Sequence, residues 1–169
     1  GEHGLLLLHG AVYDAASWED QATVLANHGF SVLAMEELAP DAVQDGIAYL
    51  MKTCGVSGFT VIGASAGGSA ALKVLADKPE GITGLILLSA TGDVDALGEY
   101  PKLFVASAGE GFEQRLESMA NDAPGDQNQT LILPGSAHAQ AIFPTDQGEP
   151  LVNAILAFLD DTVDWDNPS

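Results

Sequence analysis

Short apolar runs alternate with amphipathic segments along most of this chain of 169 residues. Six of the runs consist mainly of aliphatic and β-branched residues, a composition that favours strands buried on both faces. They span residues 4–9, 30–35, 59–62, 85–88, 103–106 and 130–133.

The segments between these runs repeat apolar residues every three or four positions, which predicts helices packed by one face. Ser17 is the predicted N-cap of the first helix, and a second helix starts at Ala39-Pro40. Further helices are predicted over residues 69–76, 112–121 and 150–159. The interval 89–100 is short and acidic, so we predict no long element there.

Regular alternation of strands and helices predicts the α/β class, as a parallel sheet with helices on both faces. We expect residues 1–169 to form one domain, because 47% apolar residues suffice for a single core at this length. Ligands of such sheets bind beyond the carboxyl ends of the strands. Residues that carry chemistry should therefore lie at that edge.

One stretch offers a nucleophile. Between the third apolar run and the helix after it, the sequence Gly63-Ala64-Ser65-Ala66-Gly67 leaves room only for a very tight turn. Small residues around Ser65 suit a sharp reversal from strand to helix that holds the central residue in strained geometry with its hydroxyl exposed. The five letters alone are a weak signal. The flanking strand and helix make Ser65 the candidate nucleophile.

A serine hydroxyl reacts well only when a base removes its proton, and histidine is the usual base. Of the four histidines, His138 lies in a loop of small residues just after the last strand, which makes it the candidate base. His9 precedes Gly10 at the end of the first strand and is expected to be a structural hydrogen-bonding group. His3 and His28 lie near the terminus and at a helix end.

The base needs a carboxylate to orient it. Glu110 follows the fifth strand between two glycines and is the preferred acid. Asp93, after the fourth strand, is the main rival, and Glu113 and Asp146 remain as further alternatives. In a chain with this many acids, any one of them can also be an ordinary surface residue.

An oxyanion that forms during acyl transfer needs rigid hydrogen-bond donors, a role that backbone N–H groups fill well. Ala66 supplies one N–H at the start of the helix after Ser65. The loop after the first strand can supply another, from Ala11 in the first place and Val12 in the second.

The order of strand-His9-Gly10, Gly63-x-Ser65-x-Gly67, Gly109-Glu110 and Ala137-His138 resembles the α/β-hydrolase family over nearly the whole chain. The resemblance implies a Ser65, Glu110, His138 triad with Ala66 and Ala11 as the oxyanion hole.

Three features depart from the family pattern. The numbering starts at what looks like the family's third strand, so we expect about six strands in the spatial order second-first-third-fourth-fifth-sixth, without the family's first two. The interval 89–100 is too short for a lid, which implies an open site. The acid, Glu110, is a glutamate where aspartate is commoner.

Charge and composition limit the classes of partner that this chain is expected to bind. Twenty-four acidic residues against five basic ones give a net charge of −19, which predicts repulsion of nucleic acids and anionic membranes. The charge suggests adaptation to high salt, and a generic acidic surface is the alternative. No apolar run is long enough for a membrane span, and the start does not resemble a signal peptide, so we expect a cytoplasmic location, with a leader removed before Gly1 as the alternative. We find no metal-ligand cluster and no phosphate-binding loop, and therefore expect no cofactor and no metal.

The resemblance and these residues lead to one functional expectation: a small, lidless serine hydrolase that cleaves carboxylic esters with short or accessible acyl groups. Its partner would be a small-molecule ester substrate. A thioesterase or acyl transferase would use the same residues and is the first alternative. The alternative of another class is a non-catalytic binding module on the same fold.

Overall fold

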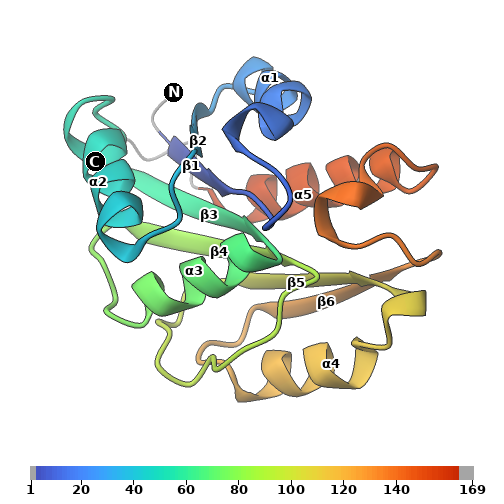
Figure 1. The fold of residues 1–169 in the computed structure, drawn as a ribbon. Coiled ribbons are helices and arrows are strands. Elements are labelled where there is room, and N and C mark those ends of the chain that lie inside the picture. Colours follow the sequence, from blue (N-terminus) through green and yellow to red (C-terminus); the bar gives the residue numbers. More distant parts are fainter. Residues whose placement is uncertain (1–2, 164–169) are drawn as a thin grey trace.

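The structure is a computed structural model that describes residues 3–163. These residues form one parallel sheet of six strands in the order β2-β1-β3-β4-β5-β6 (Figure 1). The strands are β1 (His3–Leu8), β2 (Ser31–Met35), β3 (Gly58–Ala64), β4 (Ile82–Leu88), β5 (Lys102–Ser107) and β6 (Asn128–Leu133). The number and spatial order of the strands confirm the predicted α/β architecture.

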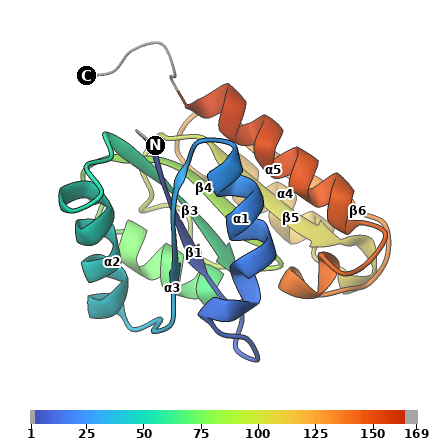
Figure 2. The same cartoon turned by 90° about the horizontal axis from the view of Figure 1, so that it is seen from above.

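Five α-helices cover the sheet: α1 (Glu19–Asn27), α2 (Pro40–Lys52), α3 (Ala66–Leu75), α4 (Glu113–Asp122) and α5 (Gly148–Thr162). Helices α2, α3 and α4 pack on one face, and α1 and α5 pack on the other, as Figures 1 and 2 show together. Three short 3₁₀ turns precede or follow the strands: η1 (Ala15–Trp18), η2 (Ala108–Glu110) and η3 (Ala139–Ile142).

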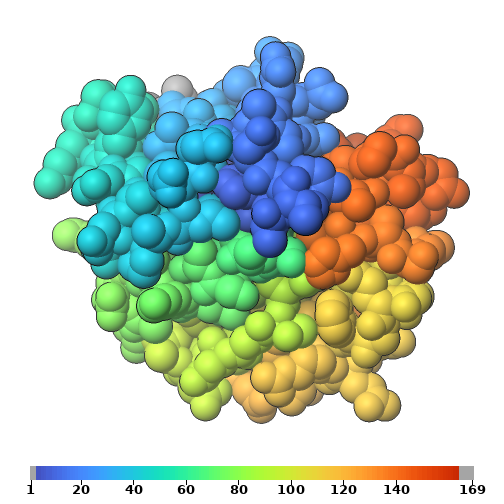
Figure 3. All heavy atoms as spheres, in the orientation of Figure 1, coloured from blue at the N-terminus to red at the C-terminus, as the bar shows by residue number. Residues whose placement is uncertain are grey.

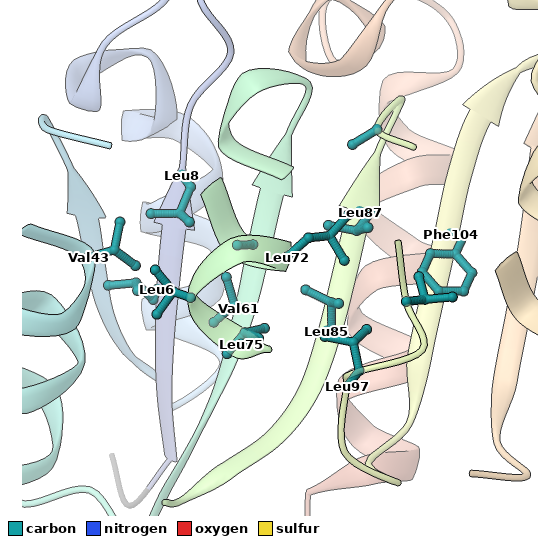
Figure 4. Packing of buried hydrophobic residues seen from close by; sticks show 14 of the residues in the cluster. Leu6, Leu8, Val43, Val61, Leu72, Leu75, Leu85, Leu87, Leu97 and Phe104 are labelled. Carbon is teal, nitrogen blue, oxygen red and sulfur yellow. The ribbon is translucent and has the colours of Figure 1, made fainter. Parts of the chain in front are cut away.

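The apolar strands are explained by burial on both faces of the sheet. Along β1, Leu6 and Leu8 point to the core under α2, α3 and α4, while Leu5 and Leu7 point to the core under α1 and α5. Figure 4 shows the first of these cores, with side chains from the strands and from α2 and α3 in contact. Successive residues of a strand face opposite sides, so a strand covered twice must be apolar throughout.

Two predicted helix starts are corrected. Ser17 does not cap α1, because it lies inside η1, where its N–H donates to Asp14 Oδ1 at 3.0 Å and Asp14 is the cap. Helix α3 begins at Ala66, directly after Ser65, and not at Ser69. The interval 89–100 contains no helix or strand, as predicted.

The strand registers place all candidate loops at one edge. Leu8 is level with Gly63, Ala64 with Leu88, and Ser107 with Leu133. The segments that start at His9, Ser65, Ser89, Ala108 and Pro134 therefore leave the sheet on the same side. Within residues 3–163, no helix has both the length and the apolar character needed to cross a membrane.

Candidate active site

The turn at Ser65 joins β3 directly to α3. Ser65 has a φ of 49° and a ψ of −111°, a conformation that side chains rarely adopt and that costs on the order of 1–3 kcal/mol. Its N–H donates to Leu88 O at 2.9 Å, which ties the turn to the neighbouring strand. A Cβ at Gly67 would lie 2.1 Å from Leu8 O, and one at Gly63 would lie 2.7 Å from the Cα of Gly68. Only glycine at these positions lets α3 start so close to the sheet.

The His138 ring lies beside this hydroxyl. His138 Nε2 is 2.8 Å from Ser65 Oγ, although 73 positions separate the two residues. The loop that carries His138 is anchored to the loop after β5, because Gly109 N–H donates to Gly135 O at 2.8 Å and Ser107 Oγ donates to Ala137 O at 2.6 Å. The His138 side chain is 52% exposed, so the site opens to solvent.

Glu110 completes the series of hydrogen bonds. Its Oε1 is 2.5 Å from His138 Nδ1, while its Oε2 accepts hydrogen bonds from Ser89 Oγ and from Ser107 N–H, both at 2.8 Å. An ionised carboxylate can only accept, so the proton of the neutral imidazole lies on Nδ1. The lone pair on Nε2 then faces Ser65 Oγ. This tautomer is the one a base needs.

The rival carboxylates lie elsewhere. Asp93 Oδ1 accepts the N–H of Asp95 at 3.0 Å and is exposed. Glu113 is exposed in the first turn of α4, and Asp146 is exposed in the segment before α5. Of the carboxylates in the described part of the chain, Glu110 is the one that contacts His138.

The two candidate oxyanion donors come from different parts of the chain: Ala66 directly follows Ser65, and Ala11 follows the first strand. Ala66 is the first residue of α3, where N–H groups have no acceptor within the helix and the helix dipole favours negative charge. Ala11 and Val12 lie in the exposed loop that follows His9-Gly10. On one face of the molecule this loop, the Ser65 turn and the segment after β6 meet as blue, green and orange surfaces (Figure 3).

His9 has the structural role expected from the sequence. Its Nδ1 is 2.8 Å from Gly10 O and its Nε2 is 2.8 Å from Glu36 O. Because both partners are carbonyl oxygens, both ring nitrogens must donate, which requires the charged imidazolium. Burial opposes this charge, but the hydrogen bonds to Glu36 and Gly10 and the nearby carboxylates of Glu36 and Asp14 raise the pKa of His9 above its ordinary value.

Two buried residues of this region were not singled out in the sequence. Ser89 has a φ of 49°, donates to Glu110 Oε2 and accepts the N–H of Ala139 at 2.8 Å. Gln140 accepts the N–H of Gly10 at 2.8 Å. The place of Ser89 directly after a predicted strand was a usable signal, whereas nothing local marks Gln140.

The site is built from side chains and backbone groups. In residues 3–163, no group of three or more histidine, cysteine, aspartate or glutamate residues could hold a metal ion. Two hollows flank the region. One of about 240 Å³ is bordered by Tyr13, Gln140 and Phe143, and one of about 380 Å³ lies between α3 and residues 91–96.

Comparison with known proteins identifies the fold. Neither a protein-family model nor a curated protein matches the sequence. Solved structures do: a dienelactone hydrolase from Anabaena variabilis has a TM-score of 0.79 at 15% identity, over 97% of this chain and 88% of that one. A monoacylglycerol lipase from Paleococcus ferrophilus has a TM-score of 0.74 at 13% identity, over 94% of each chain. An esterase from Exiguobacterium antarcticum has a TM-score of 0.66 at 13% identity, over 94% of this chain and 92% of that one.

Proposed function

We propose that this protein, which has the α/β-hydrolase fold, is a serine hydrolase that cleaves carboxylic esters. Ser65 is the nucleophile, His138 the base and Glu110 the acid that orients it. The observation that carries the proposal is the unbroken series of hydrogen bonds from Ser65 Oγ to His138 Nε2, at 2.8 Å, and from His138 Nδ1 to Glu110 Oε1, at 2.5 Å.

The geometry supports acyl transfer in two halves. As Ser65 Oγ attacks the ester carbonyl carbon, His138 Nε2 takes the hydroxyl proton, and the carbonyl oxygen becomes an oxyanion that the N–H groups of Ala66 and Ala11 stabilise. The ester C–O bond then breaks as His138 returns the proton to the leaving alcohol. His138 next removes a proton from water, which attacks the acyl carbon. As the bond between this carbon and Ser65 Oγ breaks, His138 returns the proton to Oγ, and the carboxylic acid leaves.

The form of the site favours short or accessible acyl groups. His138 is half exposed, and residues 89–100 contribute no helix or strand that could cover Ser65. The similar structures include proteins described as an esterase and as a monoacylglycerol lipase, which supports an ester as the substrate. The charge of −19 disfavours anionic substrates such as coenzyme A thioesters, so a thioesterase is the less favoured reading of the same residues.

The test is hydrolysis of para-nitrophenyl esters from acetate to octanoate, with labelling by a fluorophosphonate. We expect turnover of the short esters, labelling of Ser65, and a loss of about 10⁴-fold or more in kcat for Ser65→Ala. The matched control is Ser118→Ala, a change at an exposed serine of α4 that should leave activity unaltered.

Two outcomes would contradict the proposal. Activity that persists in Ser65→Ala would assign the chemistry to another group. A wild-type protein that neither turns over esters nor reacts with the fluorophosphonate would favour the binding module. Parallel assays with an anionic and a neutral thioester separate the thioesterase alternative.

A further inference from the structure

The loop after β1 would carry one oxyanion donor, yet it has little packing to hold it. Ala11, Val12 and Tyr13 are exposed, and Gly10 is the last buried residue before them. An exposed loop keeps the direction of its peptide groups only where hydrogen bonds fix them. The bonds of Gly10 therefore decide how well the loop is preorganised.

The carbonyl of Gly10 is held from two sides. It accepts the N–H of Tyr13 at 3.0 Å and Nδ1–H of His9 at 2.8 Å. The peptide bonds of the described residues are trans, so the N–H of Ala11 points away from the Gly10 carbonyl across the same peptide plane. Fixing the Gly10 carbonyl thus fixes the direction of the Ala11 N–H.

The amide of Gly10 is held by Gln140, from 130 positions away. Gln140 is 4% exposed, and the atom that faces Gly10 N–H at 2.8 Å must be its oxygen, because a backbone N–H can only donate. Its Nε2 donates to Ser17 Oγ at 2.7 Å, and Ser17 Oγ donates in turn to Asp14 O at 2.5 Å. Both ends of the Gln140 amide are therefore fixed.

The same short segment also carries the base. Gln140 lies in η3, two residues after His138. Ala139, between them, has a φ of 52° and donates its N–H to Ser89 Oγ, which also hydrogen-bonds Glu110. A shift of this segment would move the imidazole and release the Gly10 loop together.

We infer that Gln140 is a positioning residue that acts as a clamp: it holds the N–H of Gly10, in the His9–Gly10 peptide, and so keeps the next peptide, Gly10–Ala11, aimed so that the Ala11 N–H stabilises the oxyanion formed at Ser65. The inference rests on the proposed function. The clamp acts on a charge that exists only in the transition state. Its loss should therefore lower kcat by about 10- to 100-fold while KM changes by less than about threefold.

The main experiment compares wild type with Gln140→Leu on para-nitrophenyl acetate, with active sites counted by fluorophosphonate labelling. The second measurement is the affinity of a trifluoromethyl ketone, which forms a tetrahedral oxyanion on the serine. We expect its affinity to fall by the same factor as kcat/KM. Gln140→Glu keeps an acceptor oxygen for Gly10 but cannot donate to Ser17 Oγ, so it should recover part of the loss. Gln147→Leu is the matched control, since the Gln147 side chain makes no capping bond to α5.

A purely structural role would give a different result. The ketone affinity and the kcat of each titrated site would then stay at the wild-type value, and only the fraction of active protein would fall. That result overturns the inference. If Gln140→Leu does not fold, Ser17→Ala removes the acceptor that holds the Gln140 amide. It should lower kcat and ketone affinity together by about threefold to tenfold, and unchanged values overturn the inference.

Amide hydrogen exchange separates this inference from the proposed function. If wild type cleaves no ester, the proposed function fails. The hydrogen bond from Gly10 to Gln140 can still be tested, because the exchange rate of the Gly10 N–H is measured without substrate. Faster exchange in Gln140→Leu or Ser17→Ala than in wild type is expected, and equal exchange shows that there is no clamp.

Discussion

The two oxygens of Glu110 have different partners, and this division sets where the carboxylate points. Oε2 is occupied by two donors, Ser89 Oγ and Ser107 N–H, at 2.8 Å each. Oε1 is left for His138 Nδ1. The side chain is 7% exposed, so water competes little with these bonds. The carboxylate is thus oriented by Ser89, directly after β4, and by Ser107, the last residue of β5.

The first prediction concerns Glu110→Gln. If the new amide keeps its oxygen toward His138, its NH₂ faces the N–H of Ser107, which can only donate. If the amide turns over, the NH₂ faces Nδ1 and selects the wrong imidazole tautomer. If His138 is the base, as proposed, either arrangement impairs it, and we expect kcat to fall by about 10³- to 10⁴-fold in steady-state assays.

Asp93→Asn is the matched control, because it removes the same charge from the rival acid. An asparagine oxygen can still accept the N–H of Asp95, so activity should stay within about twofold of wild type. A larger loss for Asp93→Asn than for Glu110→Gln would transfer the role of the acid to Asp93.

The second prediction concerns the charge on His9. Since the folded pKa is raised, the folded state binds the proton more tightly than the unfolded chain. The stabilisation is complete below the unfolded pKa of about 6.5 and is lost as the pH rises through the folded pKa. Urea unfolding from pH 6 to 9 should show wild type losing stability relative to His9→Asn over this range.

His28→Asn controls for the loss of an imidazole, since His28 is exposed at the end of α1 and contacts Val24 O. A difference between wild type and His9→Asn that stays constant from pH 6 to 9 would show that His9 is not charged in the folded protein.

At the scale of elements, hydrophobic pattern predicted which elements exist better than where they begin. Strand β4 starts at Ile82 and not at Leu85, and β6 starts at Asn128 and not at Thr130. Ladder hydrogen bonds involve the backbone, so a strand can continue past its apolar residues. The 3₁₀ turns were missed for a related reason: η1 depends on the Asp14 cap, which displaced the predicted cap at Ser17.

In the candidate site, too, the sequence predicts some of the residues and not others. Ser65, His138 and Glu110 could be proposed because each follows a strand and each has a side chain typical of the chemistry. Gln140 could not, because its contact with Gly10 joins residues 130 positions apart and depends on the final backbone path. Ser89 also follows a predicted strand, but its contact with Ala139, 50 positions away, is seen only in the fold. Sequence pattern locates the edge of the sheet, whereas the supporting contacts require the fold.

The third prediction tests the close approach of α3 to β1. A methyl group at Gly67 would meet the backbone of Leu8 and His9, which cannot yield as a side chain can. Gly67→Ala should therefore push the start of α3 outward, lower the free energy of unfolding by about 2–3 kcal/mol, and reduce activity by displacing Ser65 and Ala66. Thermal melts and ester assays on the same preparation measure both effects.

Gly92→Ala is the matched control at the same edge. Its new Cβ would meet the end of the Leu72 side chain at 2.6 Å, and that side chain can rotate away. A loss of less than about 1 kcal/mol is expected. Similar losses for both variants would mean that the backbone contact does not limit the position of α3.

At the scale of the whole molecule, the charge of −19 has few cations to balance it. Only five residues are basic, and Lys102 is fully buried, where its Nζ donates to the carbonyls of Gly98, Tyr100 and Pro124. Within residues 3–163, the ion pair between a carboxylate and a basic side chain is the contact of Glu110 with His138, inside the candidate site. In the part of the chain that the structure describes, the many surface carboxylates therefore repel one another with few cations to compensate them.

The fourth prediction follows from this repulsion. Raising the salt concentration from about 0.01 M to 1 M shortens the Debye length from about 30 Å to about 3 Å, which removes most repulsion between separated surface charges. The urea midpoint should rise steeply over this range of KCl and more slowly above it. KCl could raise the midpoint by screening charge or by strengthening the burial of apolar groups. Sucrose strengthens burial without screening charge, so a parallel sucrose series distinguishes these two causes. A variant with several exposed aspartates changed to asparagine, such as Asp77, Asp126 and Asp160, should start with a higher midpoint and gain less from KCl. A flat or falling midpoint for wild type, or equal gains for wild type and variant, would show that the acidic surface is not an adaptation to salt.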